Sequence, residues 1–380
     1  MSEHAPVSAS SAERWIHCPR SARLQEQFPD NASAAAAEGT AAHKLAENKL
    51  RSALGVKQPV LPVSQFNCLE MEGHTDDYVT FILEKLSQAK ATCHDPLIMV
   101  EQRVDFSEYV PEGFGTADCI IIADGTLHII DLKYGQGVLV EATDNPQMQL
   151  YALGALELYD GIYDITTVSM TIFQPRRENV STYTVFKESL YDWAVNILKP
   201  VALLAYKGEG EFLSGEWCRF CRASATCRAR ADEKLALAQC EFAKPPLLSD
   251  DEIAAILPQL DGLVAWANDL ESYVLKSAMG GKRWPGYKLV AGRSNRKYAD
   301  DTAVAKVAEE AGYHDIYRKT LLTITEMERL LGKPLFNDLF AGLITKPQGK
   351  PTLVSSSDKR PELSLSTAEQ DFMEDINDGN

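Results

Sequence analysis

The sequence lacks long apolar runs and has few cysteines. No uninterrupted apolar stretch approaches the ~18 residues that a membrane span needs, and the start, Met1-Ser-Glu-His-Ala, has neither the basic nor the apolar region of a secretory signal. We therefore expect a cytoplasmic protein with no membrane partner. Eight cysteines in 380 residues are too sparse for a disulfide scaffold, so clustered cysteines would indicate metal or redox chemistry.

Basic residues are also scarce, with 38 Lys and Arg against 54 Asp and Glu and a net charge of −16. Such a balance argues against a nucleic-acid partner unless positive charge is concentrated locally. Hydrophobic residues make up 45% of the chain, which excludes charge-driven disorder for the chain as a whole. At roughly 100–200 residues per domain, the length predicts two or three domains.

A proline pair, a helix-capping box and a change in composition predict the domain boundaries. Pro245-Pro246 closes the first region, and the capping box Ser249-Asp-Asp-Glu252 opens a helix whose apolar residues recur at helical spacing as far as Gly280-Gly281. Beyond about Ser355 the composition turns acidic, and such a segment is typical of disorder. The predicted domains are residues 1–244, a helical domain at 245–354 and a disordered acidic tail at 355–380.

The first region alternates between apolar runs and helical patterns. This order predicts an α/β fold, a mixed β-sheet core flanked by helices, followed by the mainly helical C-terminal domain. The expected strands are 97–104, 116–123, 126–133, 166–174 and 180–186, with helices from Pro146 to about Leu158 and from about Glu188 to Tyr206.

Asp124-Gly125 stands between two apolar runs and is a strong signal for a two-residue hairpin turn. With that turn, paired positions sum to 249, so Asp118 faces Asp131, and Lys133 points to the same face as Asp131. Two carboxylates with an ammonium beside them suit a hard cation such as Mg²⁺ or Mn²⁺. The alternative is a solvated strand end with an ordinary surface ion pair.

Four short motifs then occur in order: Glu38-Gly-Thr-Ala-Ala-His43, Gly115-Thr-Ala-Asp118, Asp131-Leu-Lys133 and Gln147-Met-Gln-Leu-Tyr151. Together they resemble the core of the PD-(D/E)xK nuclease superfamily, specifically its RecB-like branch. The resemblance covers about residues 11–230 and implies a restriction-endonuclease-like fold.

Carried over by position, the resemblance implies a metal site at the hairpin. Asp118 and Asp131 would ligate Mg²⁺ or Mn²⁺, aided by His43 and the carbonyl of Leu132. Glu101, in the preceding strand, would serve as an outer ligand, although an edge-strand charge is an equally good interpretation.

The same resemblance implies the catalytic roles. Lys133 would orient or activate the attacking water and stabilise charge in the transition state. Gln147 and Tyr151 lie four apart on one helix face and would contact the site or the DNA backbone, while core packing is the alternative for Tyr151.

Cysteines cluster at Cys218, Cys221 and Cys227, and Cys18, next to Pro19, is the best candidate for a fourth ligand. Four cysteines can hold either Zn²⁺ or a [4Fe–4S] cluster. One early cysteine plus a late Cys-x2-Cys-x5-Cys run resembles the iron–sulfur nucleases of CRISPR adaptation and the AddB-type helicase–nuclease subunits. The resemblance implies a structural [4Fe–4S] cluster, with zinc as the alternative.

Positive charge is concentrated between Ser272 and Ala299, which hold seven basic residues, no acidic one and four interleaved aromatics. Basic groups with stackable rings suit a nucleic-acid strand; a solvated loop with buried aromatics is the equal alternative. The predicted nucleic-acid contacts are Lys282, Arg283, Lys288, Arg293, Arg296 and Lys297, together with Arg176 and Arg177 in a turn between two strands.

The combined hypothesis is a metal-dependent DNA nuclease, by family analogy an exonuclease, acting in phage or prophage recombination or repair. Its partners would be DNA and a phage recombinase or single-strand-binding protein. The alternative is a non-catalytic nucleic-acid-binding accessory protein whose metal cluster is structural.

Overall fold

The computed structural model describes residues 7–29, 34–58, 64–238, 250–288, 301–310, 324–340 and 343–344. The chain divides into two compact units, the first formed by Met1–Ser249 with Gln259–Leu289 and the second by Asp250–Pro258 with Val290–Asn380. The predicted acidic tail and the candidate residues Arg293, Arg296 and Lys297 lie outside the described residues.

A five-stranded mixed sheet forms the centre of the first unit, with strands in the order β1-β2-β3-β4-β5. Only β3 and β4 pair in parallel; the other neighbours are antiparallel. The predicted α/β fold class is confirmed, and all five expected strands are present. Their bounds are Leu97–Asp105 (β1), Phe114–Ala123 (β2), Thr126–Leu132 (β3), Thr167–Gln174 (β4) and Asn179–Phe186 (β5).

The turn between β2 and β3 has the predicted geometry. Asp124 and Gly125 both have positive φ, 48° and 69°, as a two-residue type I′ turn requires. Ala123 pairs with Thr126 and Cys119 with Ile130, which is the register derived from the turn. The hairpin therefore directs Asp118 and Asp131 to the same end of the sheet.

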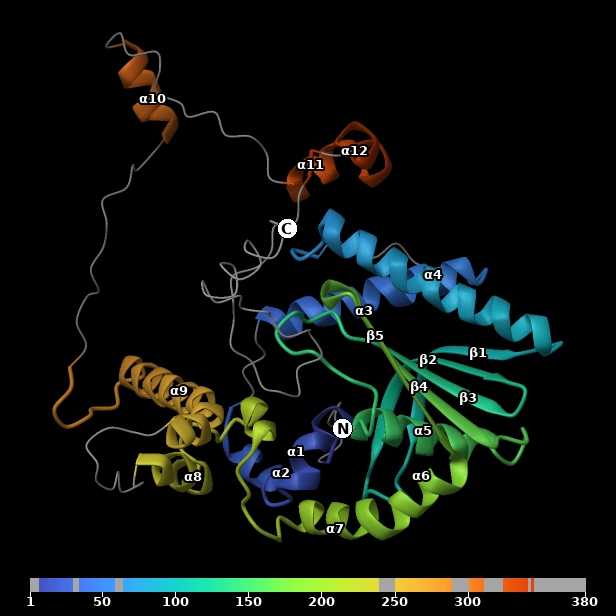
Figure 1. The fold of residues 1–380 in the computed structure, drawn as a ribbon, viewed down its shortest axis with the longest axis horizontal. Helices are drawn as coiled ribbons and strands as arrows, with labels where there is room; N and C mark the ends of the chain where they lie inside the picture. The colour runs from blue at the N-terminus through green and yellow to red at the C-terminus, as the bar shows by residue number, and fades with distance from the viewer. Residues whose placement is uncertain are drawn as a thin grey trace, which may run out of the picture. The chain divides into compact units, whose positions relative to one another are not determined.

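Helices cover both faces of this sheet (Figure 1). On one face, α3 (Ala34–Ala53) and α4 (Leu69–Thr92) bury Cys119, Ile121 and Ile130 of the hairpin. The other face packs against α5 (Pro146–Tyr159) and the short N-terminal helices, in a larger apolar cluster. Those short helices are α1 (Ala12–His17) and α2 (Ser21–Leu24).

The predicted helix from Glu188 to Tyr206 is interrupted. It consists of α6 (Lys187–Trp193), a π-helical turn (Ala194–Leu198) and α7 (Lys199–Lys207). Pro200 lies in the first turn of α7, and proline lacks the amide N–H that a continuous α-helix would use. The wider π turn absorbs this break.

The described C-terminal residues are mainly helical, as predicted. They form α8 (Arg228–Ala238), α9 (Asp250–Met279), α10 (Asp301–Glu310), α11 (Ile324–Leu331) and α12 (Lys333–Phe340). Asp269 of α9 accepts a hydrogen bond of 2.5 Å from Arg230 of α8. Among the described residues, no helix is both long and apolar enough to cross a membrane.

Candidate functional site

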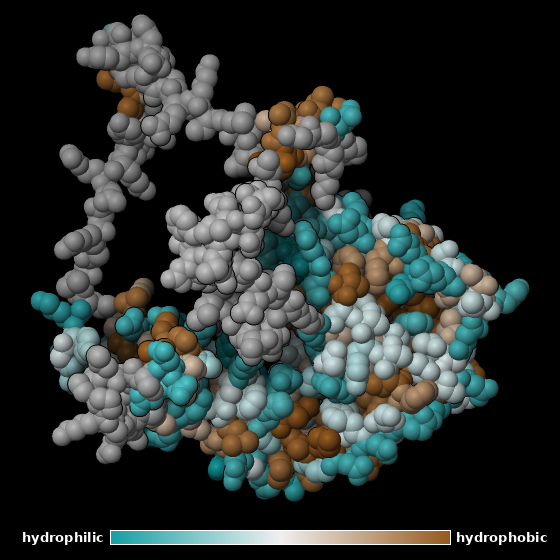
Figure 2. Space-filling model, viewed as in Figure 1, coloured by the Kyte–Doolittle hydropathy of each residue, from teal (hydrophilic) through white to brown (hydrophobic). Residues whose placement is uncertain are grey.

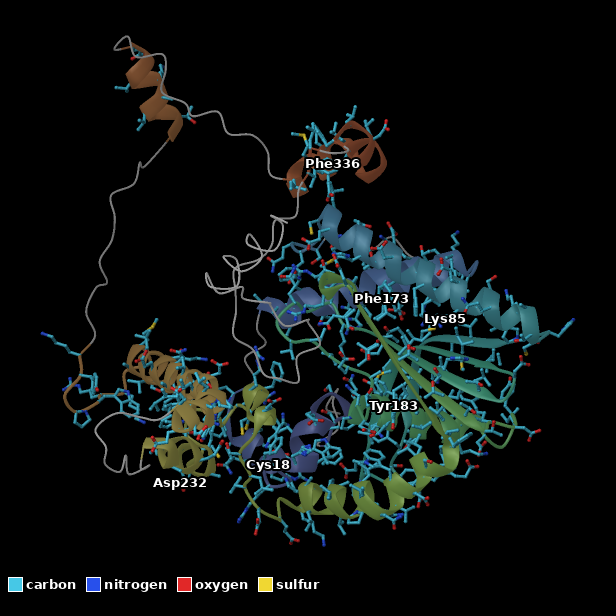
Figure 3. All side chains as sticks on the ribbon, in the orientation of Figure 1. Cys18, Lys85, Phe173, Tyr183, Asp232 and Phe336 are labelled. Atoms are coloured by element: carbon cyan, nitrogen blue, oxygen red, sulfur yellow. The ribbon has the colours of Figure 1, made fainter. Side chains whose placement is uncertain are left out.

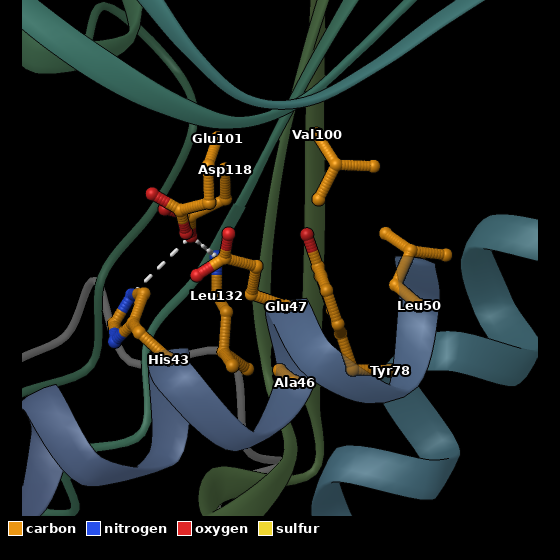
Figure 4. A pocket seen from close by; sticks show the side chains of 9 residues that line it. All are labelled: His43, Ala46, Glu47, Leu50, Tyr78, Val100, Glu101, Asp118 and Leu132. Carbon is orange, nitrogen blue, oxygen red and sulfur yellow. Dashed lines mark hydrogen bonds and ion pairs between the residues drawn. The ribbon is translucent and has the colours of Figure 1, made fainter. Parts of the chain in front are cut away.

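Asp118 lies at the centre of a small pocket between the sheet and α3 (Figure 4). Its Oδ2 accepts a hydrogen bond of 2.7 Å from the backbone N–H of Leu132 and lies 3.2 Å from Nε2 of His43. His43 reaches this position because it is on the face of α3 that packs towards the sheet, with Nδ1 2.9 Å from the Gly39 carbonyl. The Gly-Thr-x-x-His motif therefore meets the Gly-x-x-Asp motif across the pocket.

His43 and Asp118 shift each other's ionisation. Burial alone would lower the pKa of His43, but the Asp118 carboxylate, by charge and hydrogen bond, raises it to about 10. Burial alone would raise the pKa of Asp118, but the His43 charge, its hydrogen bond and the Leu132 amide outweigh burial and lower it. The two side chains therefore form an imidazolium–carboxylate pair at neutral pH.

Asp131 has a separate set of partners. It is 2% exposed, and its Oδ2 lies 2.8 Å from Nζ of Lys133. Nζ of Lys133 also donates to Oε1 of Gln147 at 2.8 Å, and Nε2 of Gln147 lies 3.4 Å from Asp131 Oδ1 and 3.0 Å from the Tyr151 hydroxyl. Burial raises the pKa of Asp131, and the charge of Asp118 adds to this although Lys133 opposes it. The aspartate, lysine, glutamine and tyrosine form one connected network.

Gly115 explains why two of the motifs occur together. A Cβ atom at position 115 would lie 2.6 Å from the Tyr151 ring, closer than carbon atoms can approach. Tyr151 is buried with its hydroxyl in the network. The glycine of Gly-x-x-Asp therefore makes room for the tyrosine of Gln-x-x-x-Tyr.

Glu101 lines the same pocket as Asp118 and carries a backbone strain. Its φ is 51°, in the left-handed region that a non-glycine residue adopts at a cost of about 1–3 kcal/mol. Burial, followed by the charges of Asp118 and Glu47, raises the pKa of Glu101 to about 7. The structure thus places Glu101 in the same pocket as Asp118 and His43.

Two polar residues of the pocket were not predicted from the sequence. Glu47 projects from α3 one turn after His43, and Tyr78 projects from α4 (Figure 4). The Tyr78 hydroxyl is buried and has no hydrogen-bond partner among the described residues. The i,i+4 spacing from His43 could have indicated Glu47; no local signal distinguishes Tyr78 from the other apolar-face residues of α4.

The donor set suits a hard cation, but the side chains as placed do not surround one. Leu132 lines the pocket and contributes its amide to Asp118. In the described part of the chain, no three His, Cys, Asp or Glu side chains form a group that could hold a metal ion. His43 and Lys133 instead neutralise the two carboxylates, because buried acids need a counter-charge.

The four candidate cluster cysteines line a single small cavity. Cys18, at the end of α1, accepts a hydrogen bond from the Leu213 amide at 3.4 Å, and Figure 3 shows it where the N-terminal helices meet the segment after α7. Cys218, Cys221 and Cys227 approach from that segment, and all four are free thiols. Burial raises the pKa of Cys221, while Arg14, which also lines the cavity, opposes this shift.

The predicted nucleic-acid contacts have different surroundings. Arg176 is only 15% exposed and its guanidinium pairs with Glu38 at 3.2 Å and Glu70 at 3.4 Å. Arg177 donates to the Gln136 carbonyl at 3.0 Å. In the structure Arg176 therefore joins α3, α4 and the turn after β4, and its charge is directed inward. Lys282, Arg283 and Lys288 lie exposed after α9.

Residues 4–361 match a family described as "Protein of unknown function (DUF2800)". Among solved structures, the chain is similar to one titled "Crystal structure of SSO0001", with 14% sequence identity and a TM-score of 0.28. The match covers 60% of this chain and 89% of that one.

Proposed function

The chain belongs to the DUF2800 family, and from the site itself we propose that it is a metal-dependent DNA nuclease that hydrolyses phosphodiester bonds. One observation carries the proposal: the four motifs converge on the open end of the β2–β3 hairpin, with Asp118 against His43 and Asp131 against Lys133. A solvated strand end, the alternative interpretation, would leave these acids exposed. Asp131 is instead buried in a hydrogen-bonded network.

Each residue of the network has a role that its contacts support. Lys133 presents an ammonium beside Asp131, where it can orient a water and stabilise the negative charge that develops on a phosphate. Gln147 holds the ammonium through its carbonyl oxygen and the Tyr151 hydroxyl through its amide. Lys133 is thereby restrained to one direction, and restraint of this kind reduces the cost of reaching the transition state.

The site also fits a divalent cation by its chemistry. Two carboxylates, an imidazole and a buried tyrosine hydroxyl meet at one end of the sheet, and this hydroxyl has no hydrogen-bond partner in the part of the chain that the structure describes. Asp118 and Asp131 would hold the ion with the Leu132 carbonyl and with His43, whose imidazole would first have to lose the proton that pairs it with Asp118. Glu101 would serve as an outer ligand. When bound, Mg²⁺ or Mn²⁺ would polarise the phosphate and lower the pKa of a coordinated water.

We further propose that Cys18, Cys218, Cys221 and Cys227 hold a structural [4Fe–4S] cluster, with Zn²⁺ as the alternative. Their shared cavity supports the proposal because residues about 200 positions apart bring four thiols to it, beside one guanidinium and the hydroxyls of Ser21 and Ser224. By family analogy we also propose that the protein acts in phage or prophage recombination or repair. It would act in the cytoplasm, with a recombinase or a single-strand-binding protein as partner.

The test is hydrolysis of end-labelled DNA by the full chain with Mg²⁺ or Mn²⁺. We expect Asp131→Ala and Lys133→Ala each to lower the rate at least about a hundredfold, as loss of a charge-stabilising group typically does. Lys187→Ala is the matched control, because Lys187 pairs with Asp160 at 2.8 Å away from the hairpin acids; its rate should equal that of the wild type.

Absence of nicking or degradation by the wild type under every metal condition would contradict the nuclease proposal. That outcome would favour the non-catalytic accessory protein. Equal activity of the wild type and Asp131→Ala would show that a different site, or a contaminant, performs the hydrolysis.

A further inference from the structure

A cleft beside α9 is lined by aromatic and basic side chains that are not part of the proposed nuclease site. The chain reverses after α9 through Gly280-Gly281, where Gly281 has a φ of 93°, and residues 282–288 return along the helix. Between the helix and the returning segment lies a cleft of about 1180 Å³, larger than the roughly 300–1,000 Å³ of typical small-molecule sites. We call it the α9 cleft.

Aromatic and aliphatic side chains form its walls. Trp266, Leu270 and Val274 of α9 line one side, at helical spacing, and Trp284 and Tyr287 line the other. The indole N–H groups of Trp266 and Trp284 are buried and have no acceptor among the described residues. A buried donor without an acceptor costs about 1–3 kcal/mol, so an occupant that carries hydrogen-bond acceptors would relieve this cost.

The charge of the cleft is positive, although the whole chain is acidic. Among the described residues that line it, Lys282, Arg283 and Lys288 stand against one acid, Glu271. Nζ of Lys282 lies 4.1 Å from the Trp284 ring centroid and 5.7 Å from that of Tyr273, so a cation is already held over an aromatic face. In the region of α9, Figure 2 shows hydrophilic and hydrophobic surface side by side.

This combination selects the occupant. Nucleic-acid bases can stack on the flat rings, and phosphates can bind the neighbouring lysine and arginine side chains. The indole N–H groups can donate to base or phosphate oxygens. A duplex hides its base faces and offers no such stacking. An apolar protein segment would leave the cations and both indole donors without partners.

We propose that the α9 cleft binds a segment of single-stranded DNA, with bases stacked against Trp284 and phosphates on Lys282, Arg283 and Lys288. The inference takes from the proposed function only that DNA is the polymer. Arg230 and Asp269 tie α9 to the helix that follows the cysteine run, so the cleft belongs to the same compact unit as the hairpin acids.

The experiment measures binding of a fluorescein-labelled dT15 oligonucleotide to the full chain by anisotropy, in EDTA, so that hydrolysis plays no part. We expect Trp284→Ala to weaken binding at least about fivefold, since stacking contributes about 1–3 kcal/mol per base. Lys282→Gln should reduce the slope of log K against log salt by about 0.7. Lys276→Gln is the matched control, because Lys276 lies on the same helix but does not line the cleft.

Four results would overturn the inference: a wild type that does not bind dT15, a Lys276→Gln variant as impaired as Lys282→Gln, a blunt duplex of equal length that binds as tightly, or dTMP that competes as well as dT15. Trp284→Phe keeps a stacking ring and guards against misfolding; it should retain more affinity than Trp284→Ala. A wild type that binds dT15 but does not hydrolyse DNA would reject the proposed function and leave the cleft inference standing. A wild type that hydrolyses DNA but does not bind dT15 would reject the cleft inference and leave the proposed function standing.

Discussion

At the scale of single residues, the site is a set of matched charges. Asp118 has the His43 imidazolium and Asp131 has the Lys133 ammonium, and each pairing offsets the several kcal/mol that burial of a bare carboxylate costs. The spacing Asp-x-Lys predicted the second pairing from strand alternation. The first came from a motif resemblance, since nothing local to His43 indicates a carboxylate 75 residues later. Glu47 was not predicted, although its i,i+4 spacing from His43 could have indicated it.

The contact between Gly115 and Tyr151 makes a prediction at this scale. Gly115→Ala should lower the free energy of unfolding by about 1–3 kcal/mol, because the new methyl group meets a buried ring at 2.6 Å. It should also lower nuclease activity, because the Tyr151 hydroxyl accepts a hydrogen bond from Gln147, which in turn holds Lys133. Urea denaturation measures the first effect and the end-labelled DNA assay the second.

Gly73→Ala is the control for this substitution. Gly73 lies inside α4 with open space where a Cβ would be, so alanine there should raise stability by about 0.5–1 kcal/mol. If Gly115→Ala were as stable and active as the wild type, the coupling between the two motifs would be wrong.

At the scale of elements, the β2–β3 hairpin and α5 decide the geometry. A two-residue turn sets the register of the hairpin, and the observed pairs agree with it. The first turn of α5 is held by Asn145, whose side chain accepts from the amides of Gln147 and Met148, and by Pro146 at the first position. Gln147 therefore enters the site from the most strongly capped turn of its helix.

Removal of this cap should affect stability and chemistry together. Asn145→Ala should lower the free energy of unfolding by about 1 kcal/mol, and it should slow hydrolysis because Gln147 positions Lys133. Chemical denaturation and single-turnover rates measure the two effects. Asn145→Asp keeps an acceptor at the cap and should restore both; an alanine variant with unchanged stability would show that the cap contributes nothing.

At the scale of the whole molecule, long-range contacts bring distant segments together. The first compact unit contains both the sheet and residues 259–289. The domain boundary predicted at Pro245-Pro246 had separated them. The cysteine cavity joins α1 to a segment 200 residues later. Net charge is a poor guide at this scale because acids at the hairpin and cations at the α9 cleft are averaged.

The cysteine cavity yields a prediction for the molecule as a whole. Anaerobically purified wild type should contain iron and absorb in the visible range, and Cys18→Ala should lose both and unfold at a lower temperature. Cross-linking two segments about 200 residues apart contributes up to about 5 kcal/mol on a chain-entropy estimate. Iron quantitation, a visible spectrum and thermal unfolding measure these outcomes.

Cys68→Ala is the control, because Cys68 is exposed and does not line the cavity. A colourless wild type with one bound zinc would replace the iron–sulfur proposal with the zinc alternative. A wild type with neither metal, or a Cys18→Ala variant as stable as Cys68→Ala, would reject a cluster at this cavity.

The five strands and the register of the β2–β3 hairpin were predictable from the sequence, because both depend on turn geometry or periodicity within a few residues. The inward direction of Arg176 could not be predicted from the sequence, nor could the buried Tyr78 hydroxyl, which has no hydrogen-bond partner among the described residues. Those features depend on which segments pack together across the chain. They became visible in the folded chain, because burial and counter-charge come from residues far away in sequence.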